Sequence, residues 1–263
     1  MQMLRALYSY RAFIAGSIVR EFQAKYRNSL LGALWSILNP IAMIAVYTVI
    51  FSQIMRAKLP GVDSTFAYSI YLCSGILTWS LFSELTNRCI NIFLDHANLI
   101  KKINFPRLCL PLIVLGSALL NFTIIFGFFT LFLVLSGNFP GWSFIAIFPI
   151  LLIQMMFAMG LGLSLGILNV FFRDIGQFFG IFLQFWFWLT PIVYPITILP
   201  EQIRQVIELN PLTQLITAYQ NILVHNLWPD WSTLWPVGLV AILLCLWCLR
   251  LFRRRSGELV DEL

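Results

Sequence analysis

Long apolar segments alternate with short polar ones along most of this chain. The apolar segments recur between Leu31 and Leu251, and each holds very few charged residues. Because a helix of about 20 residues crosses the apolar core of a bilayer, the pattern predicts six membrane-spanning helices. They are expected at residues 31–55, 66–92, 108–135, 143–172, 175–194 and 231–251. The predicted fold class is all-α, a polytopic membrane protein with a single transmembrane domain over residues 1–263.

Residues 1–30 show an amphipathic pattern instead. Their apolar positions recur at helical spacing: Leu7, Ile14, Ile18 and Phe22. Polar residues are expected on the other faces: Arg11, Ser17, Arg20 and Glu21. A helix of this kind lies in the membrane interface without crossing it. We therefore expect an interface helix before the first span.

Two connections carry turn signals. Asn39-Pro40 falls inside the first span and predicts a kink or an early break there. Residues 136–141, with the sequence SGNFPG, predict a tight turn between the third and fourth spans.

The segment 195–230 contains two shorter helical patterns. Prolines at positions 191, 195 and 200 interrupt the outer end of the fifth span. Helix starts are expected at Pro200 and at Asn210-Pro211, where a capping residue precedes a proline at the first helical position. We expect two half-length helices that re-enter the outer leaflet. Two amphipathic helices lying flat on the outer surface are the alternative.

The basic residues are distributed unevenly around the spans. The N-terminal segment, the 93–107 connection and the tail from Arg250 hold most of them. Since Lys and Arg gather on the cytoplasmic side of spans, both termini and Lys101 are expected in the cytoplasm. Gly61, Asn138 and Glu208 are then expected outside. The net charge of +6 follows from this bias and does not indicate a nucleic-acid partner.

Metal-binding residues are sparse. Cys245 and Cys248 have the spacing of a redox or metal pair, but they lie in a run rich in Leu and Trp without a nearby histidine. The chain has 2 histidines in all. We expect no metal site, and ordinary packing for both cysteines.

Glu84 and Arg88 are full charges well inside a predicted span. They lie one helical turn apart, so they can pair. Charges at such depth usually face protein or water, which makes both residues candidates for a translocation pathway. A self-neutralising pair near the cytoplasmic end is the alternative.

Aromatic residues are dense around the fifth span. The candidate pathway residues among them are Phe178, Phe182, Phe185 and Trp186. Aromatic faces suit the C–H faces of sugars, because the ring quadrupole attracts slightly positive C–H groups. Lipid contact and an interfacial aromatic belt are the alternative. In the fourth span, Ala158, Gly162 and Gly166 recur every four residues, which is typical of close helix packing.

Three stretches in this order resemble a known family. They are YRNSLLGALWSILNP at 26–40, LIKKINFPR at 99–107 and TPIVYP at 190–195. Together with six spans, they resemble the membrane subunit of type-2 ABC exporters. The nearest match is the permease of O-antigen polysaccharide, with teichoic-acid permeases close behind. The resemblance covers essentially the whole chain.

The resemblance makes residues 95–107 a cytoplasmic coupling segment. The residues themselves are consistent with a short lever, because Asp95 to Asn98 can cap a helix and Pro106 ends it before the next span. A basic loop that only follows the charge bias is the alternative. The candidate ATPase-coupling residues are Asn98, Leu99, Ile100, Lys101, Lys102, Asn104 and Phe105.

The resemblance also makes the segment 195–230 a periplasmic gate. The candidate gate residues are Pro191, Tyr194, Pro195, Ile203, Ile207, Leu212, Leu215 and Tyr219. The apolar faces of the two half-helices are expected to pack on spans and on a second copy of the chain. Glu201, Arg204 and Glu208 are expected to point outward.

The implied function is the transmembrane subunit of an ATP-driven exporter. It would move lipid-linked polysaccharide, most closely O-antigen, from cytoplasm to periplasm across a bacterial inner membrane, with teichoic acid or capsular polysaccharide as the alternative cargo. The expected partners are a second copy of the chain, two ATPase subunits, the lipid-linked substrate and membrane lipids. No G-x-x-x-x-G-K-[ST] sequence occurs here, so ATP and Mg²⁺ are expected on the ATPase, with no cofactor in this chain.

Two other functional classes fit less well. An integral-membrane enzyme acting on polyprenyl-linked sugar would need grouped acidic, basic or phosphate-binding side chains. The candidates are scattered: Asp95, His96, Arg173 and Asp174. An ion-coupled carrier would be expected to show ionisable groups near mid-membrane and an internal repeat, and the sequence shows little of either.

Overall fold

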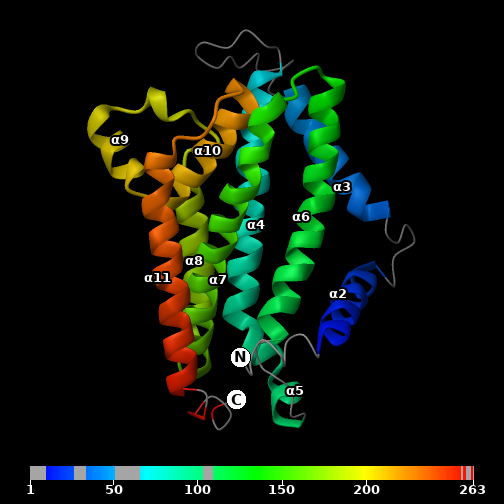
Figure 1. Cartoon of the computed structure of the whole chain (residues 1–263), viewed down its shortest axis with the longest axis vertical. Coiled ribbons are helices and arrows are strands. Elements are labelled where there is room, and N and C mark those ends of the chain that lie inside the picture. Colours follow the sequence, from blue (N-terminus) through cyan, green and yellow to red (C-terminus); the bar gives the residue numbers. More distant parts are fainter. Residues whose placement is uncertain are drawn as a thin grey trace.

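The computed structural model describes residues 10–26, 34–50, 66–102 and 109–255, together with residues 257, 258 and 262. Within these residues every regular element is a helix (Figure 1). The helices are α2 (Arg11–Tyr26), α3 (Trp35–Thr48), α4 (Ala67–Asp95), α5 (Ala97–Lys102), α6 (Cys109–Leu135), η3 (Gly141–Ala146), α7 (Ile147–Phe171), α8 (Asp174–Trp188), η4 (Ile196–Ile198), α9 (Glu201–Glu208), α10 (Pro211–His225) and α11 (Trp231–Arg255). The predicted all-α class is confirmed.

Three of the described helical segments are long and apolar enough to cross a membrane. They are Cys109–Leu135, Gly141–Phe171 and Trp231–Arg255. By comparison, α4 has 29 residues but carries more polar side chains, and α3 and α8 are shorter, with 14 and 15 residues. The count of six spans therefore stays a prediction.

Two helix ends differ from the expected positions. The fifth span was expected to reach residue 194, but α8 ends at Trp188, and the residues before Pro195 form a turn. Proline at position 191 cannot donate a backbone hydrogen bond, so the helix closes before it. The expected early break at Asn39-Pro40 is not seen, because α3 continues through both residues.

Helix α4 lies at the centre of the bundle. It packs against α6, α7, α8 and α10, and 19 of its residues are buried. Two of its buried hydroxyls donate to carbonyls of their own helix: Thr78 to Ser74 at 2.8 Å and Thr86 to Phe82 at 2.7 Å. Polar side chains can lie inside the bundle at low cost because these bonds satisfy them.

Small residues on α7 bring it close to α4. A Cβ atom added at Gly166 would lie 2.4 Å from the Cys89 carbonyl oxygen, and one at Gly162 would lie 2.7 Å from the Cys89 Cβ. Gly160 makes a similar approach to α11, with the Cys245 nitrogen 2.9 Å from the added atom. The small-residue spacing is therefore confirmed as a packing feature.

Figure 1 shows how the other helices surround this centre. Helices α2 and α3 lie on one side of α6, whereas α8 and α11 lie on the other side of the bundle. One end holds α9, α10 and the α6–α7 turn, in which Gly137 and Gly141 have positive φ. The opposite end holds α5 and the last residues of α11.

Gly166→Ala should destabilise the protein by roughly 1–3 kcal/mol, because the added methyl group meets a backbone oxygen that cannot move alone. Gly127→Ala is the matched control, since an added Cβ there has no neighbour within 4 Å, and alanine favours the helix. Thermal unfolding of detergent-solubilised protein measures both. Equal melting temperatures for the two variants would contradict the close contact of α4 and α7.

Candidate functional site

Helix α8 presents an uncovered aromatic face. Phe178 is 70% exposed and Phe185 is 65% exposed. They lie two turns apart, with Ile181 and Phe182 between them and Trp188 one turn beyond, and all of these side chains are exposed. The predicted pathway residues Phe178, Phe182 and Phe185 therefore lie together. The face that they form is available to contact a sugar chain, a second copy of the protein or lipid.

The opposite face of α8 packs into the bundle, and Trp186 belongs to it. The Trp186 ring contacts Trp79 and Phe82 of α4 edge to face, with centroids 6.5 Å and 5.4 Å apart. Its indole nitrogen donates a hydrogen bond to the Asn210 side chain at 3.0 Å. Trp186 therefore links α8 to its neighbours, although its ring also touches Phe182 on the exposed side.

The turn after α8 is tied to the N-terminal end of α4. The Tyr71 hydroxyl lies 3.0 Å from the Pro191 carbonyl oxygen and 2.9 Å from that of Tyr194. Tyr68 donates to the Val193 carbonyl at 2.6 Å. Pro191 and Tyr194, both predicted gate residues, are thus held through their backbone oxygens.

The tip of the α9–α10 hairpin reaches back into the bundle. Asn210 caps α10 by accepting from the Leu212 nitrogen at 3.1 Å, as its position before Pro211 predicts. The same side chain accepts from Trp186 and donates to the Thr190 hydroxyl at 3.0 Å. Asn210 therefore joins the hairpin tip to the C-terminal end of α8 and to the turn that follows it.

Helix α10 is a core element of the bundle. Tyr219 is fully buried and Leu212 and Leu215 are each 1% exposed, because α10 packs along α4. This burial agrees with the expectation that the apolar face of the second half-helix packs on the spans. Their side chains fill the space between α10 and the spans.

Helix α9 is only partly packed. Ile207 is buried, but Ile203 is exposed and Val206 is 67% exposed. Of the expected packing on the spans and on a second copy, Ile207 therefore makes the contact within this chain, whereas Ile203 and Val206 are exposed in it. On another face, Arg204 donates to Glu208 at 2.8 Å, and this hydrogen bond raises the pKa of Arg204 above its usual value.

Glu84 and Arg88 pair as predicted, at 3.7 Å, but they face away from α8. Arg88 makes a shorter ion pair with Glu21 of α2. Asn121 of α6 donates to Glu84 at 3.2 Å, and Ser117 donates to Glu21 at 2.8 Å. The two predicted pathway charges therefore belong to a contact between α2, α4 and α6.

The sequence interpretation missed Glu21, which was assigned to a polar face. Its spacing from Ile14 and Ile18 places it on the same side of α2, so a search for in-phase polar residues could have found it. Ser117 and Asn121 carry a similar signal, because they lie four residues apart within a strongly apolar helix.

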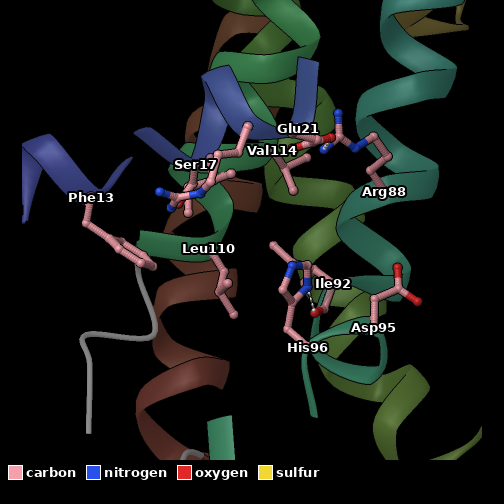
Figure 2. Close-up of a pocket in the computed structure, with 11 residues that line it drawn as sticks. Phe13, Ser17, Glu21, Arg88, Ile92, Asp95, His96, Leu110 and Val114 are labelled. Carbon is pink, nitrogen blue, oxygen red and sulfur yellow. Dashed lines mark hydrogen bonds and ion pairs between the residues drawn. The ribbon is translucent and has the colours of Figure 1, made fainter. Parts of the chain in front are cut away.

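A cavity of about 450 Å³ lies between these helices. Figure 2 shows Phe13 and Ser17 from α2, Leu110 and Val114 from α6, and the end of α4 around it. Glu21 and Arg88 are directed toward each other at its edge. A second cavity of about 440 Å³ continues from the same ion pair and is also lined by Glu84, Ser117 and Asn121.

The predicted coupling residues divide into two groups. Asn98 and Lys101 are exposed on α5, whereas Ile100 is 9% exposed and belongs to the hydrophobic core. This burial does not fit Ile100 as a direct contact of an ATPase, the role expected of it among the coupling residues. The side chains of Leu99 and Lys102, and residues Asn104 and Phe105, lie outside the described part of the chain.

Comparison with known proteins points to one family. Residues 14–224 match the family model described as "ABC-2 type transporter". The chain is 31% identical over 266 residues to "O-antigen export system permease protein RfbA" of Myxococcus xanthus, covering 100% of both chains. It is 29% identical over 208 residues to a protein of the same name from Klebsiella pneumoniae, covering 79% of this chain and 78% of the relative. It is also 21% identical over 248 residues to "Polysialic acid transport protein KpsM" of Escherichia coli, covering 93% of each.

Asn210→Ala should destabilise the α9–α10 hairpin by about 2 kcal/mol, since it removes the α10 cap and two side-chain hydrogen bonds. Asn210→Asp is the matched variant, because it keeps the two acceptor roles and loses only the donor to Thr190. Limited proteolysis between α9 and α10 should be fastest for Asn210→Ala and intermediate for Asn210→Asp. A cleavage rate for Asn210→Ala equal to that of the unmodified protein would show that the tip is not anchored.

Proposed function

This chain belongs to the ABC-2 type transporter family, and we propose that it is the permease subunit of an ATP-driven exporter of lipid-linked O-antigen polysaccharide. Transport would run from cytoplasm to periplasm across a bacterial inner membrane. The observation that carries the proposal is the 31% identity, over the full length of both chains, to an O-antigen export permease. The chain is a transporter membrane subunit and not an enzyme.

The pathway would run along the exposed face of α8. Two copies of the chain, each presenting Phe178, Phe182 and Phe185, would enclose a channel with aromatic walls. Sugar rings can slide over such walls, because contacts between C–H groups and aromatic rings are weak and have no fixed register. This favours a long polymer with a repeating structure over a single small ligand.

The energy source would be two copies of a separate ATPase, which would also hold the ATP and Mg²⁺. Its contact on this chain would be α5, where Asn98 and Lys101 are exposed and Ile100 anchors the helix to the core. Because α5 follows α4 with only His96 between them, force applied to α5 would reach α4 directly.

The outer closure would rest on α9. The side chains of Ile203 and Val206 are exposed on it, so they are available to pack against a second copy or against lipid. In contrast, α10 would move only together with α4, on which it is packed. The resting channel would therefore be closed by α9, with Pro191, Tyr194 and Pro195 as the connection on which it turns.

Deletion of the gene tests the proposal directly. The expected result is loss of O-antigen from the cell surface and accumulation of lipid-linked polymer inside the inner membrane, both reversed by a plasmid copy. An ATPase with a phosphate-binding loop should copurify with the tagged chain. Unchanged O-antigen with loss of a capsular polysaccharide would instead favour the activity named for the polysialic acid relatives.

Phe178→Ala/Phe185→Ala should lower polysaccharide export about tenfold, if each ring contributes about 0.7 kcal/mol to holding the sugar chain. The amount of protein in the membrane should not change, because both rings are exposed. Phe148→Ala is the matched control, since Phe148 is an exposed phenylalanine on α7. Equal export by the double variant and the control would assign the α8 face to lipid contact.

A further inference from the structure

Arg88 stands between two carboxylates from different helices. It pairs closely with Glu21 of α2, whereas Glu84 of its own helix lies 3.7 Å away. All three side chains are partly buried. Arg88 is thus bonded to one acceptor while a second acceptor lies just beyond hydrogen-bond distance.

Helix α6 holds both carboxylates in place. Ser117 donates to the second oxygen of Glu21 at 2.8 Å, and Asn121 donates to the second oxygen of Glu84 at 3.2 Å. The two donors lie one turn apart on α6. Each acceptor is therefore positioned whether or not Arg88 is bonded to it.

The charges explain why a second carboxylate is useful. One guanidinium needs one carboxylate, and an additional negative charge at this depth is costly. A lone charge left behind when a partly buried pair separates is costly as well. With Glu84 adjacent, Arg88 can leave Glu21 without becoming unpaired, so α2 can separate from α4 at lower cost.

The surroundings leave room for this exchange. Two cavities, of about 450 and 440 Å³, are each lined by both Glu21 and Arg88. Close-packed cores resist rearrangement, but here the side chains border open space (Figure 2). Helix α2 otherwise packs on α6, with Ile18 of α2 against Gly116 of α6. A Cβ atom added at Gly116 would lie 2.3 Å from the Ile18 side chain.

The position of Arg88 connects the exchange to α5. Arg88 lies about two turns before the end of α4, and α5 follows at once. A displacement of α5 would therefore move Arg88 relative to α2. We propose that Glu21 and Glu84 compete for Arg88, and that transfer of Arg88 from Glu21 to Glu84 releases α2 from α4 during transport. Glu21 and Glu84 are then positioning residues, and this inference rests on the proposed function.

Disulfide cross-linking between α2 and α6 tests the exchange. Ile18→Cys/Gly116→Cys is introduced after replacement of the five native cysteines, and the shorter side chain at position 18 makes room at position 116. The rate of oxidative cross-linking is then measured in membrane vesicles without nucleotide. Export plays no part in this readout, so failure of the proposed substrate would not affect it.

The two carboxylates should have opposite effects. Glu21→Gln should slow cross-linking about fivefold, because α2 loses an ion pair of about 1 kcal/mol. Glu84→Gln should speed it, because Arg88 then has only Glu21 as a partner. A shift in the same direction for both variants, or no shift in either, would overturn the proposal and leave these residues a purely structural role.

A charge swap distinguishes loss of the Glu21–Arg88 ion pair from a general loss of structure in the variants. Glu21→Arg/Arg88→Glu restores an attraction between α2 and α4, so cross-linking should recover from the slow rate of Glu21→Gln. Failure to recover, with normal protein levels in the membrane, would contradict the exchange. The control is Glu208→Gln, which breaks a comparable pair with Arg204 on α9 and should leave the rate unchanged.

Discussion

The close contact between α7 and α4 fixes the positions of the other functional parts. Gly162 and Gly166 allow the two backbones to approach, and two buried α7 side chains strengthen the contact. Gln154 donates to the Thr78 carbonyl at 2.7 Å, and Asn169 donates to the Ile90 carbonyl at 3.2 Å. In a membrane, where apolar burial between helices contributes little, such packing and hydrogen bonding hold helices together.

Because α4 is fixed in this way, it can carry different groups on different sides. Toward α8 it presents Trp79 and Phe82, which pack on Trp186. Toward α2 and α6 it presents Glu84 and Arg88. The contact with α8 and the charged cluster therefore lie on different sides of α4. The proposed polymer pathway along α8 and the proposed link between α4 and α2 would therefore share no residues.

The two helices of the α9–α10 hairpin differ in how tightly they are packed. Helix α10 is anchored by its buried apolar side chains and by the Asn210 cap. Helix α9 keeps exposed apolar side chains and is joined to α8 through a turn that the tyrosines of α4 hold. The proposed closure by α9 agrees with this difference, because elements that move in a cycle are drawn from the less stable parts of a fold.

The sequence by itself determined the all-helical class, the small-residue packing of α7 and the starts of α9 and α10. These features depend on local rules, namely apolar run length, the size of glycine and the capping role of Asn before Pro. It also identified the pairing of Glu84 with Arg88, since residues one turn apart on a helix are neighbours.

Only the tertiary structure decided which side of each helix faces what. In a chain this apolar, periodicity does not separate core from lipid-facing positions, because both are hydrophobic. Tyr219 and Val206 both lie on apolar faces of the two half-helices expected in the segment 195–230. Tyr219 is nevertheless fully buried, whereas Val206 is largely exposed. The pairing of Glu21 with Arg88, 67 residues apart in sequence, depends on how α2 packs against α6, and no local rule contains that information.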